Sequence, residues 1–194
     1  MPIVISASDL ERLATLHVAS VPDSIVTLLG ARYARAFYRY ISSSASELIL
    51  LERSAQGVVQ GVAVLSFEPA TLSRRLFIHT PFLFYAFPAC LGLARRLLAG
   101  RAASQSEAAV AKPTTELILL FVDARVRGQG LGAKLIARTT ETLRSRNVQT
   151  FCVKTLAAEE NRALDFYAAN RFEKDGKVWE FGQEFQRFSR NTDP

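Results

Sequence analysis

The sequence of 194 residues contains few of the residues that form disulfide scaffolds and metal sites: it has two cysteines and two histidines. Cys90 and Cys152 lack metal-ligand spacing and lie in apolar surroundings, so we expect both to be buried free thiols. Neither His17 nor His79 has a second ligand at metal spacing, which favours a structural role for each. We therefore predict no metal site and no histidine base.

The chain also lacks a basic segment followed by an apolar core at its start, so we expect a cytoplasmic, reducing location. It shows no aromatic-and-basic RNA signature and no helix-turn-helix punctuation, so we expect no nucleic-acid partner. Hydrophobic residues make up 49% and charged residues 22%, as in a globular chain. The length predicts a single domain over residues 1–194. The net charge of +6 suits an anionic ligand, and equally an anionic membrane surface.

The most informative stretch runs from Glu116 to Arg138. It begins with a short, continuous apolar run, residues 117–122, which is typical of a strand buried on both faces. A turn with three glycines follows at residues 127–132, and beyond it apolar residues recur at helical spacing. The pattern predicts a buried strand, a glycine-rich loop and an amphipathic helix.

A glycine-rich loop that opens a helix is suited to binding an anion. The first N–H groups of a helix have no partner within it, and the helix dipole adds partial positive charge there. Glycine lets the backbone bend and lets a ligand approach without meeting a Cβ atom. Arg127 and Lys134 can add full positive charges. We therefore predict a phosphate or pyrophosphate site, with a loop that is glycine-rich for geometry alone as the alternative.

Two familiar phosphate-binding loops fit poorly. The P-loop needs Gly-Lys-Ser/Thr, but Lys134 is followed by Leu135. Gly128, Gly130 and Ala133 satisfy the dinucleotide pattern G-x-G-x-x-G/A. However, that motif requires an acidic residue about 20 positions further on, and residues 150–154 contain none.

Residues 122–132 resemble the acetyl-CoA motif of the GNAT superfamily of N-acetyltransferases. Its core pattern, Arg/Gln-x-x-Gly-x-Gly/Ala, is met by Arg127, Gly130 and Gly132. In that family the loop amides hold the pyrophosphate of CoA, and backbone groups at the end of the preceding strand pair with the pantetheine arm. The resemblance implies acetyl-CoA as cosubstrate and a binding site made of Phe121, Val122, Arg127, Gly128, Gln129, Gly130, Leu131, Gly132, Ala133 and Asn161.

Residues 161–172 resemble a second stretch of the same family, N-x-x-A/S-x-x-x-Tyr-x-x-x-Gly-Phe. Asn161 and Tyr167 match it, while Arg171 stands where the family usually has glycine. The resemblance implies that Tyr167 is the general acid toward the CoA sulfur and that Glu116 is the base, directly or through water. The alternatives are structural: a core aromatic for Tyr167 and a polar strand end for Glu116.

The remaining pattern predicts strands and helices in a mixed α/β (α+β) fold. The resemblance implies a GNAT-like, mostly antiparallel central sheet of about six or seven strands flanked by helices. We expect a hairpin turn at Asp175-Gly176 and a left-handed helix end at Asn170. The expected strands are residues 3–5, 47–54, 57–67, 117–122, 148–155, 172–174 and 178–188. The expected helices run from residue 8 or 9 to about 19, from 23 or 24 to about 41, after the glycine loop, and from 159 to 170.

A helical insertion is expected at about residues 69–113, between the third and fourth strands. Its apolar segment, residues 77–100, is broken by Pro88 and falls short of the roughly 20 residues that span a bilayer. It could pack on the domain as a wall of the acceptor site or a dimer contact, lie at a membrane surface, or insert into the membrane. On the second predicted helix, Arg32, Arg35 and Arg39 form a basic stripe, either solvated or in contact with an anionic acceptor.

The sequence thus predicts an acetyl-CoA-dependent N-acetyltransferase that acetylates a primary amine by direct attack in a ternary complex. The acceptor could be a small amine, an amino sugar or a peptide amine. The basic stripe and the apolar insertion favour an anionic or lipid-linked one. The alternatives are a non-catalytic CoA-binding module and a membrane-surface interaction protein. A homodimer and membrane-surface contact through residues 77–100 remain open.

Overall fold

The computed structural model describes residues 5–22, 24–80, 115–180 and 182–193. Three helices come first, and strands and helices are mixed after them. The strands are β1 (Glu47–Arg53), β2 (Val59–Ser66), β3 (Glu116–Val122), β4 (Thr150–Leu156), β5 (Glu173–Glu180) and β6 (Gln183–Asn191). The helices are α1 (Ala7–Ser20), α2 (Ile25–Leu28), α3 (Ala31–Ser43), α4 (Pro69–His79), α6 (Leu131–Arg144) and α7 (Ala163–Ala169), with a 3₁₀ turn, η1 (Ala124–Val126).

Six described strands form one sheet in the order β1-β2-β3-β4-β6-β5. Every neighbouring pair is antiparallel except β3 and β4, which are parallel. The predicted mixed, mostly antiparallel sheet flanked by helices is therefore confirmed. Of the predicted first strand, residues 3 and 4 lie outside the described part, and Ile5 is not in a strand. The insertion consequently falls between the second and third described strands.

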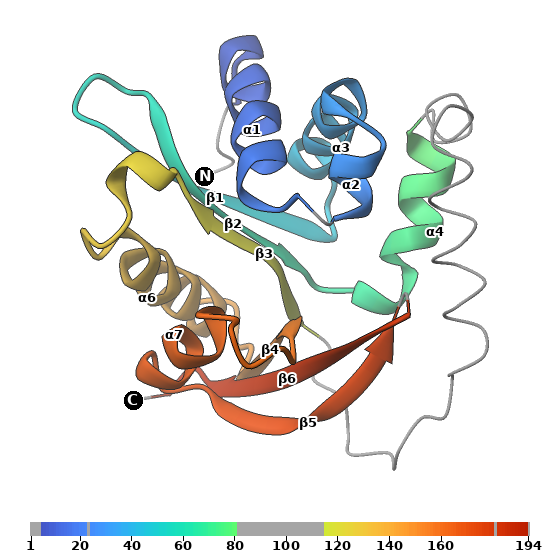
Figure 1. Ribbon diagram of the computed structural model, residues 1–194. Coiled ribbons are helices and arrows are strands. Elements are labelled where there is room, and N and C mark those ends of the chain that lie inside the picture. The colour runs from blue at the N-terminus through green and yellow to red at the C-terminus, as the bar shows by residue number, and fades with distance from the viewer. Residues whose placement is uncertain (1–4, 23, 81–114, 181, 194) are drawn as a thin grey trace.

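Helices cover both faces of the sheet (Figure 1). Helices α1, α2 and α3 lie on one face, and α6 and α7 lie on the other. Each face has its own apolar core, which includes Leu13, Phe37 and Val62 on the first side and Leu135, Phe151 and Phe188 on the second. These side chains are at most 3% exposed, so each face has a core that excludes water. The run 117–122, predicted to be buried on both faces, is only partly so: Leu117 and Phe121 are buried and the other residues are half-buried.

Helix α1 begins with a capping box in which Ser6 and Asp9 satisfy each other's backbone N–H groups. Near its end, His17 is fully buried. Its Nδ1 lies 2.8 Å from the Tyr38 hydroxyl, and its Nε2 lies 2.8 Å from the Ser24 hydroxyl. Burial lowers the pKa of His17 to about 4, so the ring is neutral at physiological pH. This environment is that of a structural histidine.

The second predicted helix is in fact two helices. Helix α2 ends at Leu28 and α3 begins at Ala31, because Gly30 takes a φ of +89° and interrupts the helical path. Apolar residues recur at helical spacing on both sides of Gly30, so the sequence pattern did not indicate this break. Of the apolar residues at this spacing, Tyr33 and Phe37 are buried, whereas Leu28 is exposed.

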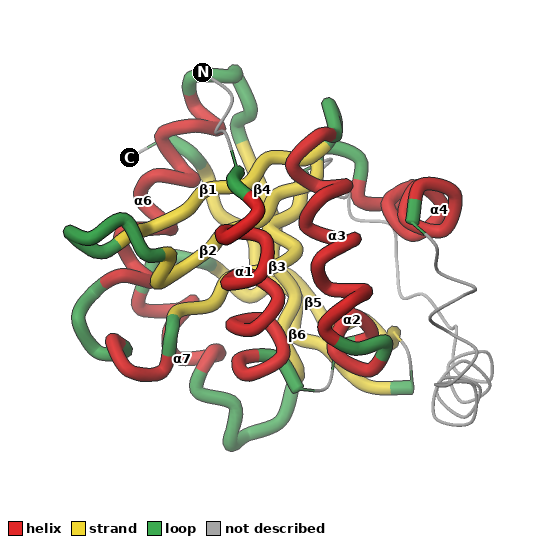
Figure 2. Tube along the Cα trace, turned by 90° about the horizontal axis from the view of Figure 1, so that it is seen from above, coloured by secondary structure: helices red, strands yellow, loops and turns green. Residues whose placement is uncertain are grey.

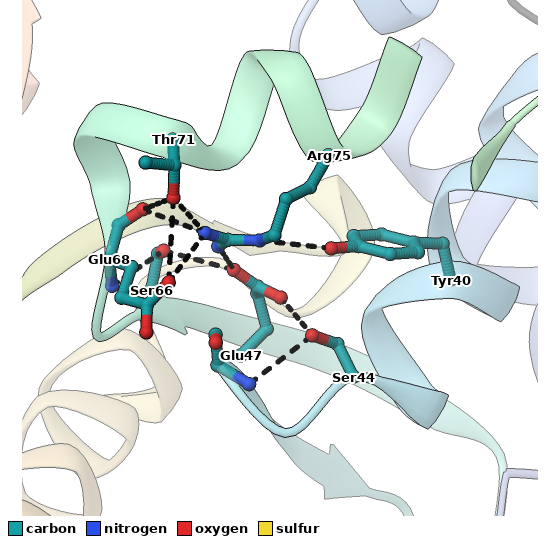
Figure 3. Close-up of polar contacts among 8 residues, drawn as sticks. Tyr40, Ser44, Glu47, Ser66, Glu68, Thr71 and Arg75 are labelled. Atoms are coloured by element: carbon teal, nitrogen blue, oxygen red, sulfur yellow. Dashed lines mark hydrogen bonds and ion pairs between the residues drawn. The ribbon is translucent and has the colours of Figure 1, made fainter. Parts of the chain in front are cut away.

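Helix α4 is the described part of the predicted insertion and lies beside α3 (Figure 2). A polar cluster holds it against the sheet edge (Figure 3). Arg75 ion-pairs with the fully buried Glu47 of β1 and with Glu68, at 2.9 Å, and its Nε donates to the Tyr40 hydroxyl at 3.1 Å. Because a buried carboxylate needs a cation, this contact fixes where α4 starts.

Most of the apolar segment at residues 77–100 lies outside the described residues, as does Cys90. Its first residues, Phe77–His79, end α4, where Phe77 and Ile78 are exposed. Among the helices that the structure describes, none is both long and apolar enough to cross a membrane.

The predicted hairpin at Asp175-Gly176 is wrong. Strand β5 runs through both residues and ends at Glu180, and β6 begins at Gln183. Gly176 instead sits in a β-bulge, with φ at +81° and a register shift between Lys174 and Lys177. A glycine after aspartate permits either a turn or a bulge, and the pairing with β6 selects the bulge.

Helix α7 also ends differently from the prediction. Asn170 has a φ of −96°, so it is not left-handed, and the next residue, Arg171, takes the left-handed conformation with a φ of +61°. Arg171 thus adopts, with a Cβ atom, the conformation for which glycine is favoured.

We expect Arg171→Gly to have a free energy of unfolding about 1 kcal/mol higher than that of Arg171→Ala, because only glycine relieves the left-handed strain. Both variants remove the arginine side chain, so their difference isolates the backbone effect. Chemical denaturation monitored by circular dichroism measures it. Equal stability of the two variants would contradict this expectation.

Candidate functional site

The central cleft begins where β3 and β4 part. These strands pair only at Glu116 with Cys152 and at Leu117 with Val153. The next residue, Ile118, is an extra residue in the pairing of β3 with β2. Such a bulge bends and twists a strand, which explains why β3 turns away from β4 at this point. Residues 118–122 of β3 therefore have no paired residue on β4.

The resulting cleft has a volume of about 1730 Å³. It is lined by β3, β4, the glycine-rich loop and α7, and by parts of α1, α2, α3, β5, β6 and the start of α4. Most of the predicted site residues line it: Glu116, Phe121, Val122, Arg127, Gly128, Gly130, Leu131, Gly132, Ala133, Asn161 and Tyr167. Gln129 does not line it, so its predicted cofactor contact gains no support from position. The fold thus brings together two motifs separated by about 30 residues of chain.

The glycine-rich loop presents backbone N–H groups at one end of the cleft. Gly128 and Gly130 have φ values of +80° and +78°, and Gly130 is the left-handed residue directly before α6. Among the described residues, none accepts a hydrogen bond from the backbone N–H groups of residues 128–132. These unpaired donors, together with the start of a helix of 14 residues, form a site suited to an anion.

Gly132 has a different role from the other two glycines. It lies inside α6, and a Cβ atom there would approach the ring of Phe166 to 3.1 Å. Gly132 therefore permits the close packing of α6 against α7. The three glycines look alike in sequence, but only two of them shape the loop.

The two predicted loop cations also differ. Arg127 lines the cleft, and its Nε donates to the carbonyl of Val122 at 3.2 Å, while no described carboxylate forms an ion pair with it. Lys134 lies 2.7 Å from the buried carboxylate of Glu52 and does not line the cleft. Burial alone would raise the pKa of Glu52, but Lys134 and Arg138 outweigh it and lower that pKa. The positive charge of Lys134, which was predicted to serve the phosphate site, is thus neutralised by Glu52.

A contact that the sequence did not reveal anchors the loop. Asp123, directly after β3, accepts a hydrogen bond from the backbone N–H of Arg125 at 3.1 Å and ion-pairs with Arg125 and with Arg12 of α1. The two guanidinium groups hold the pKa of Asp123 well below its usual range. Arg12 is 111 residues away in the sequence, so no local pattern identifies this contact.

At the other end of the cleft, Glu116 is largely buried where the strands part. Burial raises the pKa of Glu116 above its usual value, although the ammonium group of Lys154, 3.2 Å away, opposes this rise. A carboxylate with a raised pKa is better matched to accepting a proton near neutral pH. The position of Glu116 at the start of β3 agrees with the prediction.

Tyr167 lines the cleft from α7 and is 6% exposed. Its ring packs edge-on against Phe166 and Phe172, and no described residue hydrogen-bonds its hydroxyl. Burial raises the pKa of Tyr167 well above its usual range, so the hydroxyl keeps its proton at neutral pH. A protonated hydroxyl beside the cleft can donate a proton.

Asn161 also lines the cleft, but its side chain is used by the protein. Its amide nitrogen donates to Thr155 at 2.8 Å and to the Leu156 carbonyl at 2.7 Å, and its oxygen accepts from the backbone N–H of Ala163. These bonds join the end of β4 to the start of α7. The predicted cofactor contact of Asn161 stays a prediction.

The predicted basic stripe lies elsewhere. Arg32, Arg35 and Arg39 line a separate hollow of about 610 Å³ with Tyr40 and His79, and none of them lines the central cleft. Arg35 pairs there with Glu11. In the part of the chain that the structure describes, no cluster of metal-ligating side chains occurs.

Comparisons with solved structures agree with this geometry. The chain is similar to the ribosomal-protein-S18-alanine N-acetyltransferase from Escherichia coli, with a TM-score of 0.59, 11% identity, and coverage of 99% of this chain and 93% of the other. It is also similar to an N-acetyltransferase from Staphylococcus aureus Mu50, with a TM-score of 0.59, 12% identity and coverage of 97% and 95%. An aminoglycoside 6'-N-acetyltransferase complexed with coenzyme A gives a TM-score of 0.62, 10% identity and coverage of 97% and 93%.

At such low identity these likenesses show the fold, and no curated protein matches the chain. The family comparison reaches further, because it matches residues 28–172 and so covers the glycine-rich loop, Glu116 and Tyr167. The chain belongs to the acetyltransferase (GNAT) family.

Proposed function

We propose that the protein transfers the acetyl group of acetyl-CoA directly to a primary amine. The observation that carries this proposal is the continuity of the central cleft, which joins the unpaired loop N–H groups at one end to Glu116 at the other. Two of the similar proteins support an amine acceptor, because one is a ribosomal-protein-S18-alanine N-acetyltransferase and the other an aminoglycoside 6'-N-acetyltransferase.

The residues of the cleft fit a CoA thioester. The N–H groups of residues 128–132 and the guanidinium of Arg127 offer donors and charge for the pyrophosphate. The backbone of residues 118–122, which has no paired residue on β4, offers hydrogen-bonding groups for the pantetheine arm. The thioester would supply an acyl group that an amine can attack. Binding along this path would leave the reacting carbon near the point where the strands part.

Glu116 and Tyr167 have the chemistry that acetyl transfer needs. An amine must lose a proton to become a nucleophile, and Glu116, with its raised pKa, would accept that proton directly or through water. The departing thiolate needs a proton, which the Tyr167 hydroxyl would donate. Holding both substrates in one cleft contributes further by orienting them.

Cys152 gives a reason to favour direct transfer over an acyl-enzyme. This buried free thiol lines the cleft opposite Glu116. Burial raises the pKa of Cys152 to about 12, so the thiol is protonated at neutral pH and is a poor nucleophile. Transfer in a ternary complex needs no such intermediate.

The acceptor end of the cleft favours a cationic amine. Glu116, Glu180 and Lys154 line the cleft together, and the single ammonium group of Lys154 pairs with both carboxylates, which leaves an excess negative charge there. Arg187, which also lines the cleft, is paired with Asp175 at 2.9 Å, and Glu68 is paired with Arg75. The basic stripe lines the other hollow, so it offers nothing to an acceptor in the central cleft. We therefore give preference to cationic acceptors over the anionic or lipid-linked ones that the sequence favours.

An amine panel tests the function. With acetyl-CoA as donor, we expect CoA release with at least one of spermidine, kanamycin and an alanine-terminated peptide. We expect little with glucosamine 6-phosphate, because Glu116 and Glu180 share one ammonium group and their excess negative charge repels its phosphate. Thiol release and product mass measure the reaction. CoA binding with no turnover on any amine would instead indicate a non-catalytic CoA-binding module.

Tyr167→Phe should lower the turnover of the best amine by about 100-fold or more, because it removes a general acid. The affinity for CoA should stay nearly unchanged, since the ring remains in place. Steady-state kinetics and calorimetry with CoA separate these effects. Tyr40→Phe, which removes a hydroxyl bound to Arg75 outside the central cleft, is the control and should retain full turnover. Unchanged turnover in Tyr167→Phe would reject the acid assignment.

Gly130→Ala should weaken CoA binding by about tenfold, because a residue with a Cβ atom strains the left-handed loop that presents the N–H groups. Gly57→Ala is a matched control. Gly57 has a φ of +79°, a Cβ atom there would also meet open space, and it lies in the turn between β1 and β2. Both variants should lose about 1 kcal/mol of stability, but only Gly130→Ala should lose CoA affinity in calorimetry. Equal affinities would reject the loop as the CoA site.

A further inference from the structure

Three charged side chains from three strands meet at the acceptor end of the central cleft. The ammonium group of Lys154 on β4 lies 3.2 Å from a carboxylate oxygen of Glu116 on β3. It also lies 2.8 Å and 3.0 Å from the two carboxylate oxygens of Glu180 on β5. The side chains of Glu116, Lys154 and Glu180 are 14%, 22% and 39% exposed, so the cluster runs from the interior toward solvent.

The other charged group near Glu116 is already neutralised. The positive charge of Arg187 on β6 lowers the pKa of Glu116. However, the Arg187 guanidinium already pairs with the Asp175 carboxylate at 2.9 Å and donates to the Asp175 carbonyl at 3.0 Å. On α4, Glu68 lines the same cleft and pairs with Arg75 at 2.9 Å. Lys154 is therefore the cation that makes direct contact with Glu116.

The remaining neighbours of Glu116 carry no charge at neutral pH. On β2, its register partner is the buried Ser66. On β4, its register partner is Cys152, whose thiol stays protonated because burial raises its pKa to about 12. The protonation of Glu116 thus depends mainly on burial and on the charges of Lys154 and Glu180, with a smaller influence from the paired Arg187.

These influences oppose each other. Burial raises the pKa of Glu116, Lys154 lowers it, and Glu180 raises it through like charge. A single ammonium group is shared between two carboxylates, so the ion pair of Lys154 with Glu180 weakens its ion pair with Glu116. A buried carboxylate that loses its cation takes up a proton rather than remain charged.

We propose that Lys154 is a positioning residue that keeps the Glu116 carboxylate ionised in the cleft, and that Glu180 weakens this hold by sharing the same ammonium group. This inference rests on the proposed function, in which Glu116 accepts the proton of the amine. The two neighbours would then set, in opposite directions, the pH at which Glu116 becomes able to act.

The sign of each effect follows from the charges. Removing the cation in Lys154→Met should move the titration midpoint of Glu116 upward by about one pH unit or more. Removing the competing anion in Glu180→Gln should move it downward by about half a unit. Lys154→Arg keeps the charge and should restore a midpoint near that of the unchanged protein. A purely structural role for Lys154 would not give opposite shifts.

Carbon-13 NMR of labelled glutamate side chains measures the midpoint in protein without CoA or amine, with the Glu116 resonance identified by its loss in Glu116→Gln. Lys177→Met is the matched control, because Lys177 on β5 forms an exposed ion pair with Glu184 on β6 at 2.8 Å. It should leave the Glu116 midpoint unchanged. Should Lys154→Met fail to fold by circular dichroism, Glu180→Gln still reports the predicted downward shift.

The pH dependence of kcat/KM with the best amine of the panel links the titration to catalysis. Its acidic limb should move with the NMR midpoint in both variants. Midpoints that stay fixed in Lys154→Met and Glu180→Gln overturn the inference, whatever the activity. Midpoints that move while the acidic limb stays fixed overturn the positioning role. If the unchanged protein acetylates no amine, the proposed function is wrong and the catalytic role of Lys154 is wrong too. The electrostatic effect of Lys154 and Glu180 on the Glu116 midpoint is still measured by NMR in that case.

Discussion

The parting of β3 from β4 after two paired residues is the constraint on which the rest of this structure depends. A sheet that stayed paired would fill the space that the central cleft occupies and would satisfy the backbone groups of residues 118–122. The bulge at Ile118 supplies the bend, and the loop after β3 places the start of α6 beside the opening. The local irregularity thus opens a path for an extended ligand, and that path ends at a loop suited to an anion.

Buried carboxylates form a second common feature of the fold. Each lies on a strand or at its end and meets a cation from another element, which ties helices to the sheet at defined points. Because a buried charge without a partner is strongly destabilising, such pairs specify geometry more than they add stability. The pairs are Glu47 with Arg75, Glu52 with Lys134 and Arg138, Asp123 with Arg12 and Arg125, and Glu116 with Lys154. The last of these lies inside the cleft, where we infer a role in proton transfer.

Local sequence patterns predicted much of this arrangement and failed where the outcome depended on contacts. Gly30 broke a helix that the apolar periodicity made continuous, because a positive φ cannot be read from hydrophobic spacing. Asp175-Gly176 formed a bulge instead of a hairpin, because pairing with β6 extends past it. Lys134 looked like a phosphate ligand, but Glu52, more than 80 residues earlier, binds it.

The sequence by itself determined the strand β3, the glycine-rich loop and the start of α6, and through them the family, because these features arise from neighbouring residues. It also identified Glu116 and Tyr167 as residues that line the cleft. Only the tertiary structure decided which cation meets which carboxylate, including the sharing of Lys154 between Glu116 and Glu180. Ion pairs of this kind join residues far apart in the chain, and their partners are chosen by how the strands align, which no local pattern encodes.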